Sequence, residues 1–222
     1  MKDWRAILEE HLAAADAPAV LNRALLARFA RTAKGCPVAP SSLSYWLKTG
    51  KARGKLQAVQ RGLFLNRWRR PAGTLADAAF WLRTDAVVSL NTVLGDAGVL
   101  NNPSHTVTAV VPLDRGAPPP RLGRQRTRAG SLHFFGLPRR ILEAGAAADR
   151  LSRAEQYDHP RATPEKALFD WLYLAASPRS HRTWPPHADM DMELLNLQRL
   201  RRLAKAADMK HVLQTWLQDL PE

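Results

Sequence analysis

The fold of the first third of the chain is decided by residues 40–66, which read PSSLSYWLKTGKARGKLQAVQRGLFLN. The first half of this stretch places Leu43, Trp46 and Leu47 at the spacing of one buried helical face. A proline followed by serines is typical of a helix start, because proline fits the first turn and a serine hydroxyl caps free amides. We therefore predict a short helix that begins at Pro40.

The second half of the stretch changes its period. After Gly50, residues 56–60 and 63–66 are short apolar runs separated by Arg61 and Gly62. Two such runs around a glycine-containing turn are typical of a β-hairpin. The sequence therefore predicts a hairpin directly after the short helix.

Two further helices are predicted before this stretch. Residues 2–15 carry apolar side chains at helical spacing, and a second helix is expected to start at Pro18, continue through Phe29 and stop near Gly35. Helix, turn, short helix and hairpin is the element order of a winged helix-turn-helix domain. The outer side of the short helix would then enter the DNA major groove.

The charge of the chain is concentrated in this first third. The protein has 33 basic and 20 acidic residues, a net charge of +13, and residues 1–75 hold 14 of the basic and 4 of the acidic ones. Between Asp16 and Asp77 twelve basic residues occur and no acidic one. A surface of one sign is the electrostatic footprint of a protein that contacts nucleic acid phosphates. A solvated basic face would normally mix both signs.

The predicted DNA-binding residues follow from this placement. Polar side chains on the outer side of the short helix are expected to lie in the major groove, where they can bond phosphates or base edges, namely Ser42, Ser44, Tyr45 and Lys48. The turn of the hairpin contributes Arg61. Backbone contacts are expected from Lys51, Arg53, Lys55 and Arg67. Trp46 shares the buried stripe and is predicted to be a core residue.

A domain boundary is predicted at residues 71–73, Pro-Ala-Gly, which divides the chain into domains 1–72 and 73–222. After it, Thr74 is expected to cap a helix that runs to Leu82, and Ser89 to cap another that ends at Leu94.

Two strands are predicted in the second domain, at residues 105–112 and 131–135. The segment between them is expected to form a loop or an edge hairpin. It is rich in arginine, with Arg115, Arg121, Arg124, Arg126 and Arg128. A second nucleic-acid contact, a dock for an acidic partner and a solvated loop all fit this composition.

The C-terminal half is predicted to be helical. Thr163 is expected to cap a helix on which Lys166 and Asp170 pair on the outside. A further helix is expected to open at Asp189 or Asp191, and residues 211–220 to form the last. The predicted fold class is α+β, an N-terminal winged helix-turn-helix followed by a mixed α/β domain rich in helices.

No catalytic signature stands out. The single cysteine, Cys36, excludes a disulfide scaffold, and the sequence has no zinc-binding spacing, phosphate-binding loop or nucleophile elbow. Asp189, Asp191 and Glu193 are the best group of carboxylates, and acids at a helix start are favoured without any metal. We therefore expect no enzyme activity, no catalytic residues, no metal and no cofactor.

Other functions stay open at this point. A metal-dependent nuclease would use Glu165, Asp170 or the acids around Asp189. A protein-interaction module would direct its cations to an acidic partner, and RNA would serve as an alternative ligand. No apolar run is long enough to cross a bilayer and the chain starts with MKDWRAILEE, so a cytoplasmic protein without a membrane partner is expected.

Four segments of the chain resemble the AbiEi family of type IV toxin–antitoxin antitoxins. They are LQAVQRGLFLN, VVSLNTVLGDAGVLNN with the following HTVTAVVP, ATPEKALFDWLYLA, and LLNLQRLRRLAKAADMKHVLQ. The resemblance covers about residues 20–217. Its most specific part is residues 162–174, where the family carries a Pro-Glu-Lys-Ala-Leu-x-Asp helix start.

This resemblance implies a transcriptional repressor. An N-terminal winged-helix domain would bind double-stranded DNA repeats in its own promoter, and the C-terminal domain would neutralise a nucleotidyltransferase-like toxin. The chain departs from the family in its extra helix at residues 2–15 and its arginine-rich segment 118–130. A stand-alone regulator is the alternative that these departures leave open.

Overall fold

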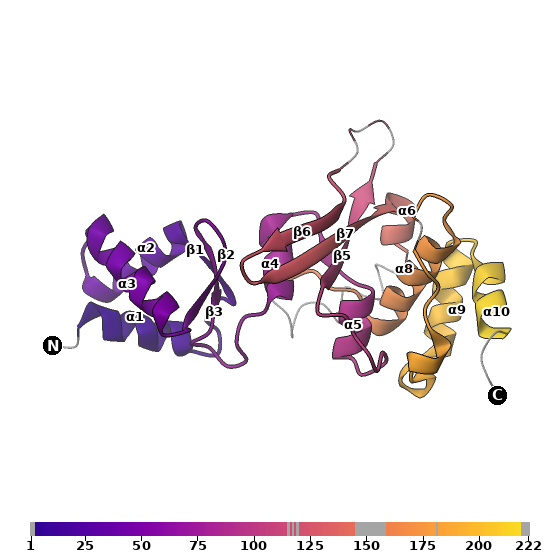
Figure 1. The fold of residues 1–222 in the computed structure, drawn as a ribbon, viewed down its shortest axis with the longest axis horizontal. Coiled ribbons are helices and arrows are strands. Elements are labelled where there is room, and N and C mark those ends of the chain that lie inside the picture. Colours follow the sequence, from indigo (N-terminus) through magenta and orange to yellow (C-terminus); the bar gives the residue numbers. More distant parts are fainter. Residues whose placement is uncertain are drawn as a thin grey trace.

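The computed structural model describes residues 3–144, apart from residues 115, 117 and 119, and residues 159–180 and 182–218. These residues form a mixed α+β fold with two small sheets. Figure 1 shows two lobes that follow one another along the long axis of the molecule. We call residues 3–70 the N-terminal lobe and residues 74–218 the C-terminal lobe. Within the described residues, none of the helices has both the length and the apolar character that crossing a bilayer requires.

The N-terminal lobe packs helices against a small sheet. Its elements are α1 (Trp4–Ala13), β1 (Val20–Asn22), α2 (Arg23–Lys34), α3 (Pro40–Ala52), β2 (Leu56–Gln60) and β3 (Leu63–Asn66). The three strands are antiparallel and lie in the order β1-β3-β2. The predicted hairpin is therefore present, with a register shift between Ala58 and Gln60.

The predicted start of the second helix at Pro18 is wrong. Val20 pairs with Leu65 of β3, so the chain is extended before α2 begins. Asn22 then caps α2, because its Oδ1 accepts a hydrogen bond from the Leu25 amide over 2.7 Å. The cap ends the strand and starts the helix.

Helix α3 has the buried face that its apolar spacing predicts. Leu43, Trp46 and Leu47 are all buried, and Trp46 stacks on Trp68 with 5.3 Å between ring centroids. The predicted serine cap is wrong, because the N-cap residue is Ala39 and makes no side-chain cap bond. Pro40 occupies the first turn of α3. Its missing amide hydrogen costs nothing there, because the amides of the first turn have no acceptor within the helix.

Asn66 ties the sheet of this lobe to its helices. The side chain is fully buried, and its Nδ2 donates to the carbonyl oxygens of Leu12 at 2.9 Å and Pro18 at 3.1 Å. A buried amide requires such partners, because losing them would cost about 1–3 kcal/mol. The end of β3 is thus fixed to the segment that connects α1 and β1.

The C-terminal lobe surrounds a four-stranded sheet in the order β4-β5-β7-β6. Its strands are β4 (Val87–Val88), β5 (Val107–Leu113), β6 (Gly123–Thr127) and β7 (Gly130–Pro138), and its α-helices are α4 (Leu75–Leu82), α5 (Asn91–Asp96), α6 (Arg139–Leu142), α8 (Pro164–Ala176), α9 (Leu197–Ala206) and α10 (Lys210–Gln218). Strands β5 and β7 are parallel, and the other neighbouring pairs are antiparallel. Figure 1 shows α8, α9 and α10 together at the far end of this lobe.

Part of the arginine-rich segment is a strand. Arg124 and Arg126 lie at alternate positions of β6, and both are exposed. Strand β6 is at the edge of the sheet. The edge hairpin, one of the two predicted arrangements, is the one observed between β6 and β7. Arg115 lies outside the described residues.

Two predicted helix starts in this lobe are wrong. Ser89 does not cap α5, whose N-cap is Leu90, and Ser89 is instead fully buried. Asp189 ends a short 3-10 turn, His187–Asp189, and Asp191 caps the next one, Met192–Leu194, before α9 begins. Asn196 caps α9 by accepting from the Arg199 amide over 3.0 Å.

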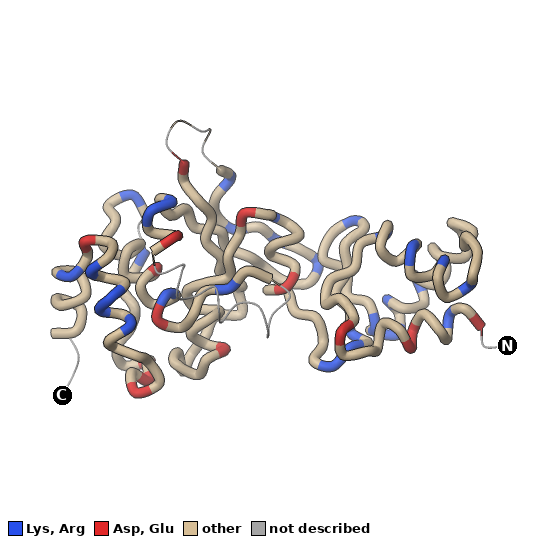
Figure 2. The backbone as a smooth tube through the Cα atoms, turned by 180° about the vertical axis from the view of Figure 1, so that it is seen from behind, with Lys and Arg blue, Asp and Glu red and all other residues tan. Residues whose placement is uncertain are grey.

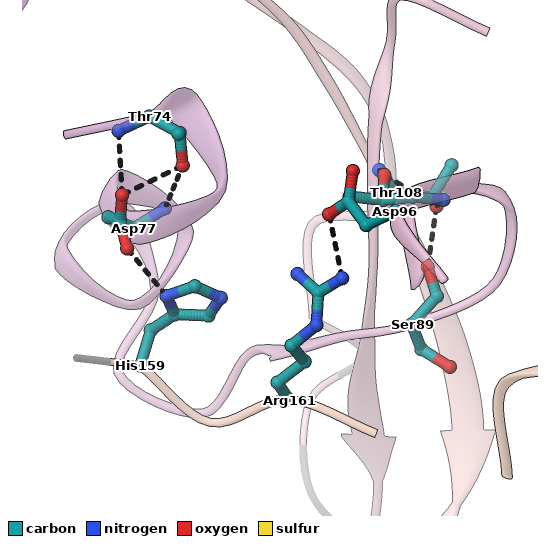
Figure 3. A network of polar contacts seen from close by, with 8 residues as sticks. Thr74, Asp77, Ser89, Asp96, Thr108, His159 and Arg161 are labelled. Carbon is teal, nitrogen blue, oxygen red and sulfur yellow. Dashed lines mark hydrogen bonds and ion pairs between the residues drawn. The ribbon is translucent and has the colours of Figure 1, made fainter. Parts of the chain in front are cut away.

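The chain before α8 is tied between two helices, as Figure 3 shows. His159 Nδ1 lies 2.9 Å from Asp77 Oδ1 on α4, and Arg161 Nη2 lies 2.6 Å from Asp96 Oδ2 at the end of α5. Burial raises the pKa of Asp77, but hydrogen bonds from His159 and Thr74 outweigh it and leave that pKa below its usual value. The Ala162 amide also donates to the Val88 carbonyl over 2.9 Å.

The two lobes share an apolar cluster. It contains Ala19, Val20, Val59, Leu63 and Leu65 from the N-terminal lobe and Ala78 from α4. In addition, the Arg128 amide donates to the Val59 carbonyl over 3.0 Å.

Gly73 permits the close backbone approach where the lobes meet. A Cβ atom at this position would lie 2.2 Å from the carbonyl oxygen of Ala19, which no side chain can tolerate. The Gly73 amide donates to the Asn66 carbonyl over 2.8 Å. The segment that connects the lobes is therefore held directly against the N-terminal sheet.

Candidate nucleic-acid interface

The outer side of α3 presents polar side chains to solvent. Ser44, Tyr45 and Lys48 are exposed, and Tyr45 keeps 66% of its surface accessible. Ser42 is only half-buried and lies toward the edge of this face. The arrangement follows from the apolar stripe of α3, which turns the opposite side of the helix outward.

Arg23 joins this face from the start of α2. Its Nη2 donates to Ser44 Oγ over 3.0 Å, and its backbone amide donates to the Gly62 carbonyl at the hairpin turn over 3.1 Å. The beginning of α2, the exposed side of α3 and the hairpin turn with the exposed Arg61 therefore converge. We call Arg23, Ser44, Tyr45, Lys48 and Arg61 the α3 face.

Sequence reasoning missed Arg23 as a site residue. The signal that locates it is Asn22, because an asparagine cap puts the next residue in the first turn of a helix. The incorrect helix start at Pro18 placed Arg23 in the middle of a helix and concealed this position.

A second group of cations lies at the other end of the hairpin. A groove of about 590 Å³ is lined by Lys51, Arg67, Arg70 and Arg128, with Gln57 on its floor accepting a hydrogen bond from Arg67 Nε over 3.1 Å. We call these four cations the basic groove. It brings together side chains from both lobes, since Arg128 follows β6.

Lys55 precedes β2 and Arg61 follows it, so these two residues lie six positions apart, at opposite ends of the strand. At the rise of an extended strand this is about 20 Å. The predicted residues thus fall into two groups, one at each end of the hairpin. One helical turn of duplex DNA, about 34 Å, is long enough to meet both.

Arg53 is directed toward α1. Its Nη1 lies 3.3 Å from Glu9 Oε1, and the same carboxylate oxygen accepts from Trp46 Nε1 over 3.2 Å. Arg53 is exposed, so this ion pair contributes little to stability. Its charge is nevertheless partly neutralised, unlike that of Lys51, for which no ion pair is found within the described residues.

Apart from α1 and the turn after it, the described part of the N-terminal lobe has no acidic residue. All carboxylates of its described residues lie between Asp3 and Asp16, along α1 and the turn after it. Figure 2 shows the basic positions of this lobe distributed along its helices, the hairpin and the connecting chain. Positive charge therefore predominates around the α3 face and the basic groove.

Two of the carboxylates considered for a nuclease, Glu165 and Asp170, are engaged in the fold, whereas Glu193 is exposed. Asp170 is buried, and Glu165 Oε1 accepts from the Asn196 amide over 3.1 Å. Within the described residues no group of three or more histidine, cysteine, aspartate or glutamate side chains is placed so that it could hold a metal ion.

Lys166 and Asp170 form an ion pair in the interior, so the prediction that they pair on the outside of α8 is wrong. Lys166 keeps 2% and Asp170 1% of its surface accessible. Ser89 Oγ donates to the second oxygen of Asp170 over 2.8 Å, and Thr108 Oγ1 donates to the Ser89 carbonyl over 2.6 Å. Helix α8 is covered on several sides, by α5, α9 and α10, which is why its polar positions are buried too.

Comparison with known proteins finds a similarity of fold. No protein-family profile matches the chain, and no curated protein matches it. The fold is similar to the crystal structure of the RV2827C protein from Mycobacterium tuberculosis, with a TM-score of 0.53 and 17% sequence identity, over 100% of this chain and 83% of that one. At this identity the similarity concerns the fold alone.

Proposed function

We propose that this protein is a DNA-binding transcriptional repressor. Its N-terminal lobe acts as a winged helix-turn-helix domain, in which α3 enters the major groove and the β2–β3 hairpin is the wing. The observation that carries the proposal is the convergence of Arg23, Ser44 and the Gly62 turn on one acid-free face.

The element order supports this assignment. Helix, strand, two helices and a hairpin whose last strand lies in the middle of the sheet is the topology that a winged helix requires. The N-terminus of α2 adds the positive end of a helix dipole to the charge of the Arg23 side chain, and both favour a phosphate.

Each group of residues has a distinct role in the proposed complex. Ser44 and Tyr45 meet base edges and therefore determine which sequence is preferred. Lys48, Arg23 and Arg61 contact the flanking phosphates, and the basic groove holds the backbone farther along the duplex. Arg53 contributes less than Lys51, because Glu9 already neutralises part of its charge.

We further propose that the repressor is the antitoxin of a type IV toxin–antitoxin pair in the cytoplasm and regulates its own promoter. The four AbiEi-like segments support this proposal, and the C-terminal lobe is then the part that neutralises the toxin. A groove of about 320 Å³ between α9 and α10 is lined by Arg201, Arg202 and Lys205 around Leu213 and Leu217. Its chemistry suits an acidic amphipathic segment of a protein partner.

The test measures binding of the full chain to duplex DNA from upstream of its own gene, against a random duplex of equal length. Fluorescence anisotropy at several salt concentrations gives both affinities. Six to eight phosphate contacts predict a slope of log K against log salt of about −5 to −7. The Arg202→Gln variant is the matched control, because it removes an exposed arginine from the C-terminal lobe. Equal affinity for both duplexes, or no salt dependence, would overturn the proposal.

A further inference from the structure

A groove in the C-terminal lobe is separate from the candidate DNA interface. It has a volume of about 790 Å³ and lies between the β6–β7 edge of the sheet and the end of α8. Leu122, Phe135 and Tyr173 contribute apolar walls, and Ser177 and Arg182 line its side nearest the chain after α8. Sites for small organic molecules typically have volumes of about 300–1,000 Å³ and mostly apolar walls.

Arg182, which lines this groove, lies over two aromatic rings. Its guanidinium carbon lies 4.5 Å from the ring centroid of Phe135 and 4.5 Å from that of Trp171. One end of the guanidinium, Nη2, donates to Asn91 Oδ1. The position of the cation is therefore restricted by two aromatic rings and one hydrogen bond.

No carboxylate of the described residues balances the charge of Arg182. Its Nε is buried and has no hydrogen-bond partner within the part of the chain that the structure describes. No carboxylate of those residues forms an ion pair with Arg182, and none lines the groove. A buried cation without a counterion is costly, and an anion in the groove would offset the charge of Arg182.

Two more basic groups lie beside Arg182. His133 stacks on Phe135 with 4.1 Å between ring centroids, and Arg124 on β6 shares with His133 and Arg182 a smaller hollow of about 190 Å³. Burial lowers the pKa of Arg182 to about 10, so it stays protonated at neutral pH. Burial, Arg182 and Arg124 lower the pKa of His133.

We propose that this groove binds a small organic anion, with an aromatic or otherwise flat apolar body against Phe135 and Tyr173 and an acidic group on the Arg182 guanidinium. The apolar walls favour such a body over a bare inorganic ion, which would leave them wet. The fixed guanidinium favours a planar or multi-oxygen acidic group, because it offers its donors in one orientation. The site is independent of the proposed DNA binding, since none of its residues belongs to the N-terminal lobe.

The test uses two probes that differ in one anionic group. The anion is 8-anilinonaphthalene-1-sulfonate, and N-phenyl-1-naphthylamine is the same ring system without the sulfonate. Both are titrated by fluorescence into the folded full-length protein. We expect the anion to bind at least tenfold more tightly than the neutral probe, because a charge-assisted hydrogen bond accounts for a factor of about ten to a hundred.

Three variants locate the site. Arg182→Gln is expected to weaken anion binding about tenfold or more and to leave the neutral probe within about twofold. Ser177→Trp fills the groove without removing charge and is expected to weaken both probes. Arg202→Gln removes a cation from the α9–α10 groove, which is also apolar and basic, and is expected to change neither. Because Arg182→Gln removes a packed side chain, its thermal unfolding midpoint is measured first.

Several outcomes would overturn the proposal. These are equal affinities for the two probes, loss of anion binding in Arg202→Gln in place of Arg182→Gln, and full displacement of the anion by millimolar inorganic phosphate, which would indicate a simple anion site. Should Arg182→Gln fail to fold, Ser177→Trp decides alone: unchanged binding of both probes in that variant excludes this groove.

Discussion

Arg23 Nη2 donates a hydrogen bond to Ser44 Oγ over 3.0 Å, and this contact joins the first turn of α2 to the exposed side of α3. Because Ser44 Oγ accepts from a cation, its own hydrogen is left to be donated outward. A base edge that offers an acceptor, such as guanine or thymine in the major groove, suits this orientation. The two residues therefore act together in the proposed complex.

Replacing Arg23 should affect both affinity and preference. In Arg23→Ala a phosphate contact is lost and Ser44 is no longer oriented, so we expect binding to the promoter duplex to weaken about tenfold and the salt slope to decrease by about 1. Arg201→Ala, an exposed arginine on α9, is the control in the same anisotropy assay. An affinity of Arg23→Ala equal to that of the control would separate Arg23 from the interface.

Ser44 and Tyr45 should determine sequence preference, whereas Lys55 should not. We expect Ser44→Ala or Tyr45→Ala to change the ranking of promoter variants by about 1–3 kcal/mol per altered base pair, and Lys55→Gln to weaken all duplexes about equally. Competition against a library of single base-pair changes measures both effects. If the ranking survives both substitutions on α3, this helix is not the reader.

The ion pair of Glu9 and Arg53 predicts a substitution that strengthens DNA binding. Glu9→Gln keeps an oxygen acceptor for Trp46 but removes the charge that neutralises Arg53. We therefore expect DNA binding to tighten about twofold to threefold, because an exposed pair is weak. Glu10→Gln, on the same helix, is the comparison: an equal gain there would reflect net charge alone.

Breaking the interior ion pair of α8 should be costly. Lys166→Met leaves a buried Asp170 carboxylate without its cation, and such a change costs about 3–5 kcal/mol of the free energy of unfolding. The exposed pair Arg139 and Glu143 has the same four-residue spacing, and Glu143→Gln should cost less than about 1 kcal/mol. Urea unfolding measures both. A loss in Lys166→Met as small as in the control would mean that water reaches the pair.

Which features the sequence predicts depends on how local their cause is. The buried stripe of α3 and the Thr163 cap of α8 follow from residues within one or two helical turns, so both were predicted correctly. Strand β1 has three residues and exists because β3 pairs with it, and no local pattern announces such a partner.

Burial by elements that are distant in the sequence explains the wrong predictions. Lys166 and Asp170 have the spacing of a surface pair, and they are inside because α5, α9 and α10 cover the helix that carries them. Arg182 likewise contacts Asn91 and Phe135, which lie far from it in the chain. Sequence separation of this kind hides a site whose members have no shared motif. For the α3 face, the polar residues of α3 were visible and Arg23 was not.

The contact between Asp77 and His159 should make stability depend on pH. The pKa of Asp77 is lowered in the folded protein, because hydrogen bonds from His159 and Thr74 outweigh the effect of burial, which by itself raises it. A carboxyl with a lowered folded pKa contributes stability above its unfolded pKa, near 3.8, and loses it as the pH falls through the folded value. We therefore expect Asp77→Asn to be less stable than the wild type by about 1–2 kcal/mol at pH 6, and the difference to shrink as the pH falls below about 4. Urea unfolding between pH 6 and 3 measures this difference, with Asp16→Asn as the exposed control. A difference that stays constant over this range would show that the charge of Asp77 does not stabilise the start of α4, and that only the shape of its side chain does.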